Sequence, residues 1–386
     1  MPRYRCSSRQ RGAARRTVSR RDFLRLAGLI TAGLLSPACQ APTPEAAPPT
    51  LPATAPATAP PTQPTAPAAA VAIGQTPAYE REAVRRQVAE LIEQLGGLGD
   101  VVRPGDSVAI KTNLTGGVGN VVRGVEPVDS FVTHPEVVRA LVEEVQAAGA
   151  SEVHIVEAVY QWESYTQWGY ADLAADLGVS LVDLNDFKPG PDFIEGLVGE
   201  GSLIYPSFIF NPILAQVDVF MSVSKMKHHY EAGVTHTMKN LFGLVPYRFY
   251  RQNQSDAYRS GFHGAPDETR SRIPRIIVDL NRARPIHFSL VDGIKTVEGG
   301  EGPWIETCRP IEPGVLIAGK NCVATDAVAT AVMGHDPAAD YPHSPFLRGE
   351  NHLNLAAAAG LGPNRLDEIE VRGVPIETAR VQFQPG

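Results

Sequence analysis

The chain has 386 residues, and its 35 lysines and arginines stand against 42 aspartates and glutamates, which gives a net charge of −7. That length accommodates one large domain or two modest ones. Residues 1–39 hold nine arginines and one aspartate, a net of +8, so the remaining residues carry −15. Such an acidic protein repels the phosphate backbone, which argues against nucleic acid as a partner.

The first 39 residues match the pattern of a signal peptide for twin-arginine export. Residues 19–25 read Ser-Arg-Arg-Asp-Phe-Leu-Arg, and residues 26–35 form a short apolar stretch. A membrane-spanning helix needs about 20 apolar residues, so this stretch fits the hydrophobic region of a signal peptide instead. We therefore predict that residues 1–39 are a signal peptide and that the twin-arginine export machinery is a partner.

The residues that follow predict a tether to a membrane. The sequence Leu35-Ser-Pro-Ala-Cys39 resembles the cleavage box of bacterial lipoproteins, although Ser36 stands where a branched apolar residue is usual. Residues 40–77 are almost wholly Pro, Ala and Thr, a composition that favours extended polyproline II and buries no core. We expect a disordered linker that holds a domain of residues 78–386 off the membrane. The domain would then lie in the periplasm or at the cell surface, with lipidated Cys39 as the anchor.

Helices and strands alternate along residues 78–386, as the spacing of apolar residues indicates. In the first half, we predict helices at residues 79–95, 134–148 (with Thr133 as N-cap) and 170–177, and strands at 107–111, 152–157 and 179–183. In the second half, we predict strands at residues 217–223, 286–292, 315–318 and 369–371, and helices at 270–282, 324–333 and 353–359. This alternation predicts a doubly wound α/β fold, in which helices cover both faces of a mostly parallel sheet. Residues 245–266 show no periodicity and would form either a lid over the site or a surface loop.

A cluster of lysines and histidines follows the predicted strand at residues 217–223. Residues 222–246 contain three of the seven lysines and three of the ten histidines of the chain. Lysine offers a compact ammonium whose pKa responds to its surroundings, which suits it to hold an anion or to act as an acid or base. Open α/β sheets bind ligands at the carboxyl ends of their strands, so the cluster stands where a ligand site is expected. Its members are Lys225, Lys227, His228, His229, His236 and Lys239.

The same cluster resembles the signature of the family called domain of unknown function 362. That signature runs roughly Pro-Lys-x-Lys-x-His and then Thr-x-x-x-Lys-Asn-x-x-Gly, and here Ser224 replaces the proline. The matching residues are Lys225, Lys227, His229, Thr235, Lys239, Asn240 and Gly243. Further matching pieces are Lys111-Thr-Asn113, Thr133-His-Pro135, Asp292-Gly293, Glu301-Gly-Pro303 and Asp326-Ala-Val328, so the resemblance spans about residues 101–373. It implies no particular reaction.

Some relatives in this family carry a ferredoxin-like segment, which this chain lacks. After residue 39 the chain has two cysteines, Cys308 and Cys322, whereas an iron–sulfur cluster usually takes four cysteine ligands. We therefore expect no iron–sulfur cluster from this chain alone. An oxidising compartment would permit a disulfide between the two cysteines.

The carboxyl ends of three predicted strands bring together the candidate site residues. We predict catalytic roles for Lys227, His229, Lys239 and Asp292, and ligand-binding roles for Lys111, Asn113, Lys225, Asn240 and Glu301. In one interpretation, the amines and the amides hold a small anionic ligand while an imidazole or a carboxylate moves a proton. In the other, His229, Asp292 and a further carboxylate hold a divalent metal. Twin-arginine substrates often fold around a cofactor before export, which favours a metal or cofactor without naming it.

Geometry and charge limit how these residues can be arranged. His228 and His229 are adjacent, so in an extended segment they face opposite ways and one of them reaches the site. Three ammonium groups in one dry pocket would depress each other's pKa. We therefore expect Lys227 or Lys239 to face the cleft with Asp292 or an anion in reach, and the remaining lysine to be solvated. Groups of different pKa in one place favour an enzyme, and the alternative is an extracytoplasmic binding lipoprotein that captures an anion or solute without catalysis.

Overall fold

The computed structural model describes residues 69–386. The predicted signal peptide, Cys39 and most of the predicted linker lie outside these residues. Within the described part of the chain, no helix is long and apolar enough to cross a membrane. Cys308 and Cys322 are buried free thiols.

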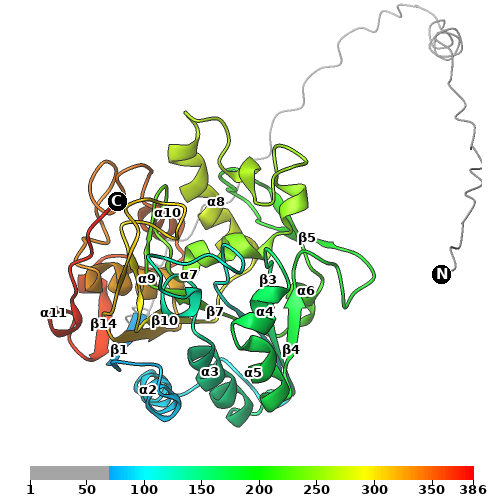
Figure 1. Ribbon diagram of the computed structural model, residues 1–386, viewed down its shortest axis with the longest axis vertical. Coiled ribbons are helices and arrows are strands. Elements are labelled where there is room, and N and C mark those ends of the chain that lie inside the picture. The colour runs from blue at the N-terminus through cyan, green and yellow to red at the C-terminus, as the bar shows by residue number, and fades with distance from the viewer. Residues whose placement is uncertain (1–68) are drawn as a thin grey trace, which may run out of the picture. The chain divides into compact units, whose positions relative to one another are not determined.

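A central sheet of eight strands organises the fold (Figure 1). Its strand order is β14-β1-β13-β10-β7-β2-β3-β4, and every neighbouring pair is parallel except the two pairs that involve β13. The mostly parallel sheet predicted from the sequence is thus confirmed. The strands are β1 (Ala69–Gln75), β2 (Ser107–Lys111), β3 (Glu152–Glu157), β4 (Ser180–Asp183), β7 (Val219–Lys225), β10 (Phe288–Gly293), β13 (Val315–Gly319) and β14 (Ile369–Gly373).

Strand β1 corrects the predicted boundary between linker and domain. The linker was expected to extend to residue 77, but Ala69–Gln75 pair with both β13 and β14. Val71, Ala72 and Ile73 are fully buried, so this strand belongs to the hydrophobic core. The alanines of β1 continue the alanine-rich composition of the preceding segment. For this reason the sequence pattern did not indicate a strand here.

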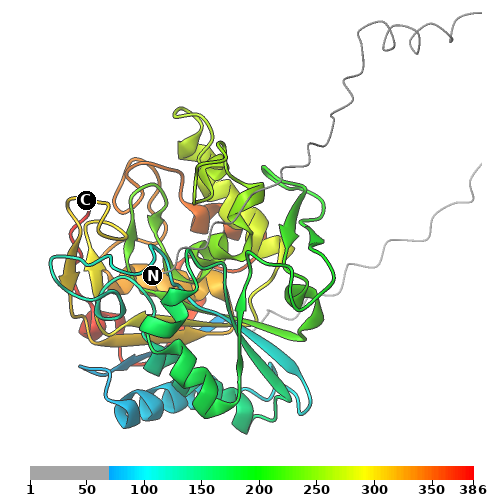
Figure 2. The same cartoon turned by 45° about the vertical axis from the view of Figure 1, so that its right-hand side comes forward.

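Helices pack on both faces of the sheet, as predicted (Figures 1 and 2). Side chains alternate along each strand, so Val108 and Ile110 of β2 face one layer while Ala109 faces the other. One layer consists of α2 (Arg81–Gln94), α3 (Pro135–Ala147) and α5 (Tyr170–Leu177). The other contains α7 (His236–Lys239), α8 (Thr269–Ala283), α9 (Cys322–Val332), α10 (His352–Ala358) and α11 (Ile376–Ala379). We call these the α3 layer and the α7 layer.

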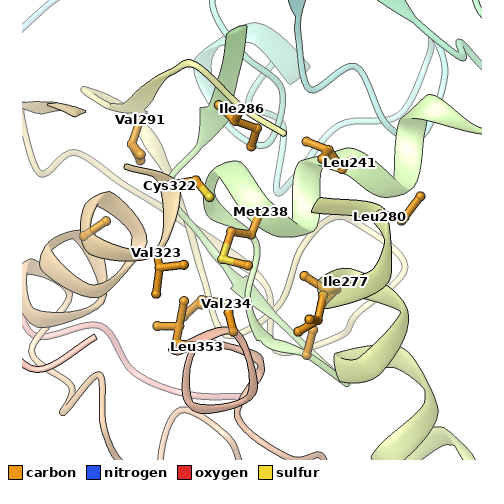
Figure 3. Close-up of a cluster of buried hydrophobic side chains, with 14 of the residues drawn as sticks. Val234, Met238, Leu241, Ile277, Leu280, Ile286, Val291, Cys322, Val323 and Leu353 are labelled. Carbon is orange, nitrogen blue, oxygen red and sulfur yellow. The ribbon is translucent and has the colours of Figure 1, made fainter. Parts of the chain in front are cut away.

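The short helix α7 lies in the middle of its layer. Figure 3 shows Met238 of α7 surrounded by apolar side chains from neighbouring elements, among them Ile277 of α8, Val323 of α9 and Leu353 of α10. All four side chains are fully buried. This packing holds α7 against the sheet although the helix itself has one turn.

Smaller elements surround the sheet. Three two-stranded sheets pair β5 (Ile194–Leu197) with β6 (Ser207–Phe210), β8 (His228–His229) with β9 (Gly233–Val234), and β11 (Thr296–Glu298) with β12 (Arg309–Ile311). The remaining helices are α4 (Glu163–Gln167) and α6 (Ile213–Gln216), with 3₁₀ turns at Pro127–Asp129, Asn240–Leu244, Tyr247–Phe249, Ser260–Phe262 and Leu366–Glu368. One predicted cap was wrong, because His134 rather than Thr133 caps α3 by accepting a hydrogen bond from the Glu136 backbone N–H. The Thr133 hydroxyl instead donates to the Val223 carbonyl.

Candidate functional site

Three neighbouring parallel strands deliver the predicted residues to one edge of the sheet. Strands β2, β7 and β10 lie side by side and end at or next to Lys111, Lys225 and Asp292. The expectation that these strands share a sheet is thus confirmed. Their carboxyl ends form the edge where open α/β folds bind ligands.

A cavity of about 610 Å³ opens at this edge, on the side of the α7 layer. Of the nine predicted site residues, seven line it: Lys111, Asn113, Lys227, His229, Lys239, Asn240 and Glu301. The wall also contains residues that were not predicted, namely Glu157, Tyr160, Tyr230, Glu231, Thr235, Tyr258, Arg259, His263 and Trp304. The segment at residues 245–266 therefore contributes to the cavity wall through Tyr258, Arg259 and His263.

Lys227 stands just beyond β7, and its ammonium has no carboxylate partner among residues 69–386. Its Nζ donates to the backbone carbonyls of Phe131 at 2.6 Å and Glu301 at 3.0 Å. The Glu301 carboxylate accepts instead from the Tyr230 backbone N–H and from Trp304 Nε1, each at 2.9 Å. Burial lowers the pKa of Lys227 to about 7, and this effect outweighs the opposing charge of Glu301. Both protonation states of Lys227 are therefore populated near neutral pH.

Lys239 is the second ammonium group of the cavity. It ends α7, and its Nζ lies 3.7 Å from the centre of the Phe242 ring, which is close enough for a cation–π contact. Among residues 69–386 it forms no salt bridge. Burial lowers the pKa of Lys239 to about 8, opposed by the charges of Glu301 and Glu231.

His229 presents one fixed tautomer to the cavity. Its Nδ1 accepts from the backbone N–H groups of Glu231 at 3.2 Å and Ala232 at 3.3 Å. In a neutral imidazole the other nitrogen then carries the hydrogen, so Nε2 is a donor. Burial, followed by the charge of Lys239, lowers the pKa of His229 well below its usual range. His229 is thus suited to donate a hydrogen bond to a ligand rather than to accept its proton.

The neighbouring His228 faces away from His229, as expected for adjacent residues in an extended segment. Its Nε2 lies 2.9 Å from Nε2 of His335, and it is absent from the wall of the large cavity.

A buried network fixes the floor of the cavity. Lys111 Nζ lies 2.9 Å from the Glu157 carboxylate and donates to Asn240 Oδ1 at 3.2 Å. The same Asn240 oxygen accepts from Asn113 Nδ2 at 3.1 Å. A side chain at Gly243 would collide with Lys111 Nζ and Glu157, so this close approach requires glycine. Lys111 is compensated by Glu157, which leaves its charge less available to a ligand than that of Lys227 or Lys239.

The structure places Lys225 and Asp292 outside the cavity, which differs from their expected position. They form a salt bridge of 2.9 Å in which neither side chain is exposed. Asp292 also accepts from the Tyr79 hydroxyl at 2.9 Å and from the His134 backbone N–H at 3.0 Å. The remaining lysine was expected to be solvated, yet Lys225 is fully buried because Asp292 supplies its counter-charge.

Side-chain alternation explains this placement. Val223 and Leu290 face the α3 layer, and residues two positions further along a strand face the same way. Lys225 and Asp292 are also direct register partners on β7 and β10, so they meet each other on that layer. The cavity lies on the opposite side.

The proposed metal pair is not brought together either. His229 lines the cavity, whereas Asp292 is engaged by Lys225, Tyr79 and His134. Within residues 69–386, no three His, Cys, Asp or Glu side chains gather in a way that would hold a metal ion.

Sequence reasoning missed several residues of the cavity. Glu157 ends the predicted strand at residues 152–157, so the rule of strand ends would have found it. Arg259 carried no sequence signal because it lies in the segment without periodicity; its Nε donates to the Val245 carbonyl at 2.8 Å, and its Nη2 is buried without a partner among the described residues. Burial lowers the pKa of Arg259 from its ordinary value. The Thr235 hydroxyl, although part of the family motif, also lacks a partner within this part of the chain.

Known proteins resemble the chain in sequence. The family model described as domain of unknown function (DUF362) matches residues 108–331. The thylakoid-associated protein sll1697 of Synechocystis sp. is 28% identical over 290 residues, which cover 75% of this chain and 81% of that protein.

Two solved structures show a lower similarity. A protein from Thermotoga maritima has 16% identity and a TM-score of 0.33, with 63% of this chain and 56% of its own covered. The lactate racemase apoprotein from Thermoanaerobacterium thermosaccharolyticum has 14% identity and a TM-score of 0.34, with 63% of this chain and 54% of its own covered. The chain thus spans little more than half the length of either structure.

Proposed function

The chain belongs to the family described as domain of unknown function (DUF362), and from its cavity we propose an enzyme that binds a small organic anion and moves a proton on it. One observation carries the proposal. Lys227 and Lys239 are buried ammonium groups in one cavity, and among residues 69–386 neither has a carboxylate within salt-bridge distance. Buried charge without a partner is costly, and a carboxylate or phosphate in the cavity would compensate it.

The residues of the cavity would bind the anion in different ways, according to the atoms that each has free. Lys239 supplies charge, while His229 Nε2 and Arg259 Nη2, which has no partner in the described part of the chain, supply hydrogen-bond donors. Such donors would hold and orient the anion.

Lys227 is the proposed proton carrier. Two carbonyls take two of its N–H groups, which leaves one N–H, or the lone pair of the neutral amine, for a ligand. A pKa of about 7 lets Lys227 give or take a proton near neutral pH.

Exchange of carbon-bound hydrogen tests the proposal without knowledge of the full reaction. The protein would be incubated in D₂O with small carboxylic acids that carry a C–H next to a carbonyl, and loss of the C–H signal would be followed by NMR. We expect exchange with at least one acid, and a loss of roughly 10²-fold or more in Lys227→Met, since positioned acid–base groups contribute that much. Lys239→Met should weaken binding instead, which would appear as a higher KM.

Lys188→Met is the matched control, because Lys188 is exposed and lies outside the cavity. Undiminished exchange in Lys227→Met would contradict the role of Lys227. Anions that bind through Lys239 but exchange no hydrogen would contradict catalysis and leave a binding protein.

We also propose that the protein is exported and held at a membrane. The arginine pair, the apolar stretch after it and Cys39 support this proposal from the sequence. The relative from Synechocystis sp. is named as thylakoid-associated, which is consistent with a membrane location in the family.

A further inference from the structure

We propose that the ligand carries a flat aromatic ring, which stacks on Trp304 while its anionic group lies against Lys227 and Lys239. The inference rests on the proposed function, because it names the class of anion that the same cavity binds.

The volume of the cavity indicates a ligand that has a sizeable uncharged part in addition to its anionic group. Cavities of about 300–1,000 Å³ hold drug-sized molecules, and this one measures about 610 Å³. Acetate or inorganic phosphate would fill a small part of it. The wall also includes aromatic and apolar side chains, namely Leu114, Tyr160, Phe242, Tyr258, Trp304 and Ile305.

Trp304 is a fixed ring with an uncovered surface. Its Nε1 donates to Glu301 at 2.9 Å, and its ring meets Phe131 edge-on with 5.8 Å between the centroids. The indole also lies against Gly116, where an added Cβ would come within 2.7 Å of the ring. Trp304 nevertheless stays 48% exposed at the cavity. A ring held in place in this way loses little freedom when a ligand stacks on it.

The same two residues support both the indole and the ammonium. Lys227 donates to the carbonyls of Phe131 and Glu301, the residues whose side chains hold Trp304. A charged group and an aromatic surface are therefore fixed relative to each other through short contacts. This pairing fits a molecule that carries both a carboxylate and an aromatic ring.

Three carboxylates test the inference on the wild-type protein. Benzoate and cyclohexanecarboxylate have the same number of carbon atoms and differ in aromaticity. Acetate has no ring. By isothermal titration calorimetry we expect benzoate to bind about 2- to 10-fold more tightly than cyclohexanecarboxylate, the range that aromatic pairing contributes. Acetate should bind most weakly. Equal affinities for benzoate and cyclohexanecarboxylate would overturn the inference, whatever the variants show.

Two tryptophans form a matched pair for mutation. Trp162 is also 48% exposed, but it does not line the cavity. Trp304→Leu should abolish the preference for benzoate, whereas Trp162→Leu should keep it. Trp304→Phe retains a ring and should preserve part of the preference for benzoate. This variant provides a second measurement of the preference if the leucine variant folds poorly. A preference that survives Trp304→Leu in folded protein would also overturn the inference.

The outcomes separate this inference from the proposed function. If all three carboxylates bind equally and Lys239→Met abolishes binding, the anion site stands and the aromatic ligand is wrong. If none of the three carboxylates binds the wild-type protein, both proposals fail.

Discussion

The buried lysines meet the cost of burial in different ways. Lys225 pairs with Asp292, and Lys111 pairs with Glu157, so each has a carboxylate that repays part of its lost hydration. Lys227 has two backbone carbonyls, which are dipoles rather than charges. Lys239 has the face of Phe242 and no salt bridge within the described residues. Among the described residues, Lys239 thus has neither a carboxylate nor a carbonyl partner to compensate its burial.

Replacing Lys239 with methionine should stabilise the ligand-free protein below pH 8. The pKa of Lys239 falls from 10.5 to about 8 on folding, so the unfolded chain binds the proton more tightly. The resulting penalty is full below pH 8 and disappears as pH rises to 10.5. The difference between these two pKa values sets an upper limit of about 3 kcal/mol on the gain. Urea unfolding at pH 6.5 and pH 10.5 would measure it, with Lys188→Met as control. A Lys239→Met variant that is less stable at pH 6.5 would contradict this account.

The short helix α7 owes its position to a buried carboxylate from α9. Asp326 accepts from the backbone N–H groups of Thr237 at 2.9 Å and Met238 at 2.8 Å, and from the Thr237 hydroxyl. These bonds satisfy the first turn of α7, while Met238 packs into the core shown in Figure 3. Asp326 therefore positions Lys239, at the far end of the same turn, without touching the cavity.

Asp326→Asn should change the pH dependence of stability. Burial raises the pKa of Asp326 from 3.8 to about 7, against the opposing hydrogen bonds from Thr237 and Met238. A raised folded-state pKa gives stability that is complete below pH 3.8 and is lost as pH rises through about 7, by up to about 4 kcal/mol. Asparagine does not titrate, so the variant should be less stable than wild type at pH 4 and recover relative to it by pH 8. Urea unfolding across this range, with exposed Asp100→Asn as control, would show the effect. A constant difference from pH 4 to pH 8 would contradict it.

Helices and strands were predictable from the sequence where the local spacing of apolar residues determines them. The strands that end at or next to Lys111, Lys225 and Asp292 are rich in apolar residues, and the sequence pattern predicted that all three end at one edge of one sheet. The direction of β13 was not predictable from alternation. No helix lies between β10 and β13, and without a crossover the chain returns antiparallel.

The sequence predicted which segments lie near the cavity better than it predicted the direction in which each side chain points. The lysine-rich motif identified Lys227, Lys239 and His229, which line the cavity. It could not show that Lys225 and Asp292 turn to the α3 layer, because the layer that each side chain faces depends on where the long helices pack. Trp304 gave no signal, since its role depends on contacts with Phe131 and Gly116, which lie far away in the sequence.

At the scale of the whole molecule, the domain and the N-terminal segment suggest separate tasks. Residues 69–386 form the sheet and its cavity. The preceding residues contain the arginine pair, the apolar stretch and Cys39, and their net charge of +8 over residues 1–39 contrasts with the acidic remainder. We propose that this segment directs export and attachment and leaves the chemistry of the cavity unchanged.

Two sets of substitutions test that division. Replacement of Arg20 and Arg21 by lysine should keep the protein in the cytoplasm, because the twin-arginine pathway reads that pair. Cys39→Ala should leave export intact but release the protein from membranes, since a lipid anchor supplies about 0.8 kcal/mol for each buried CH₂ group. Fractionation of cells that express each variant would measure location, and anion binding by the purified variants should equal that of wild type. A Cys39→Ala protein that stays with the membrane fraction would contradict the lipid anchor while leaving export in place. A lysine-substituted protein that still leaves the cytoplasm would contradict the twin-arginine route.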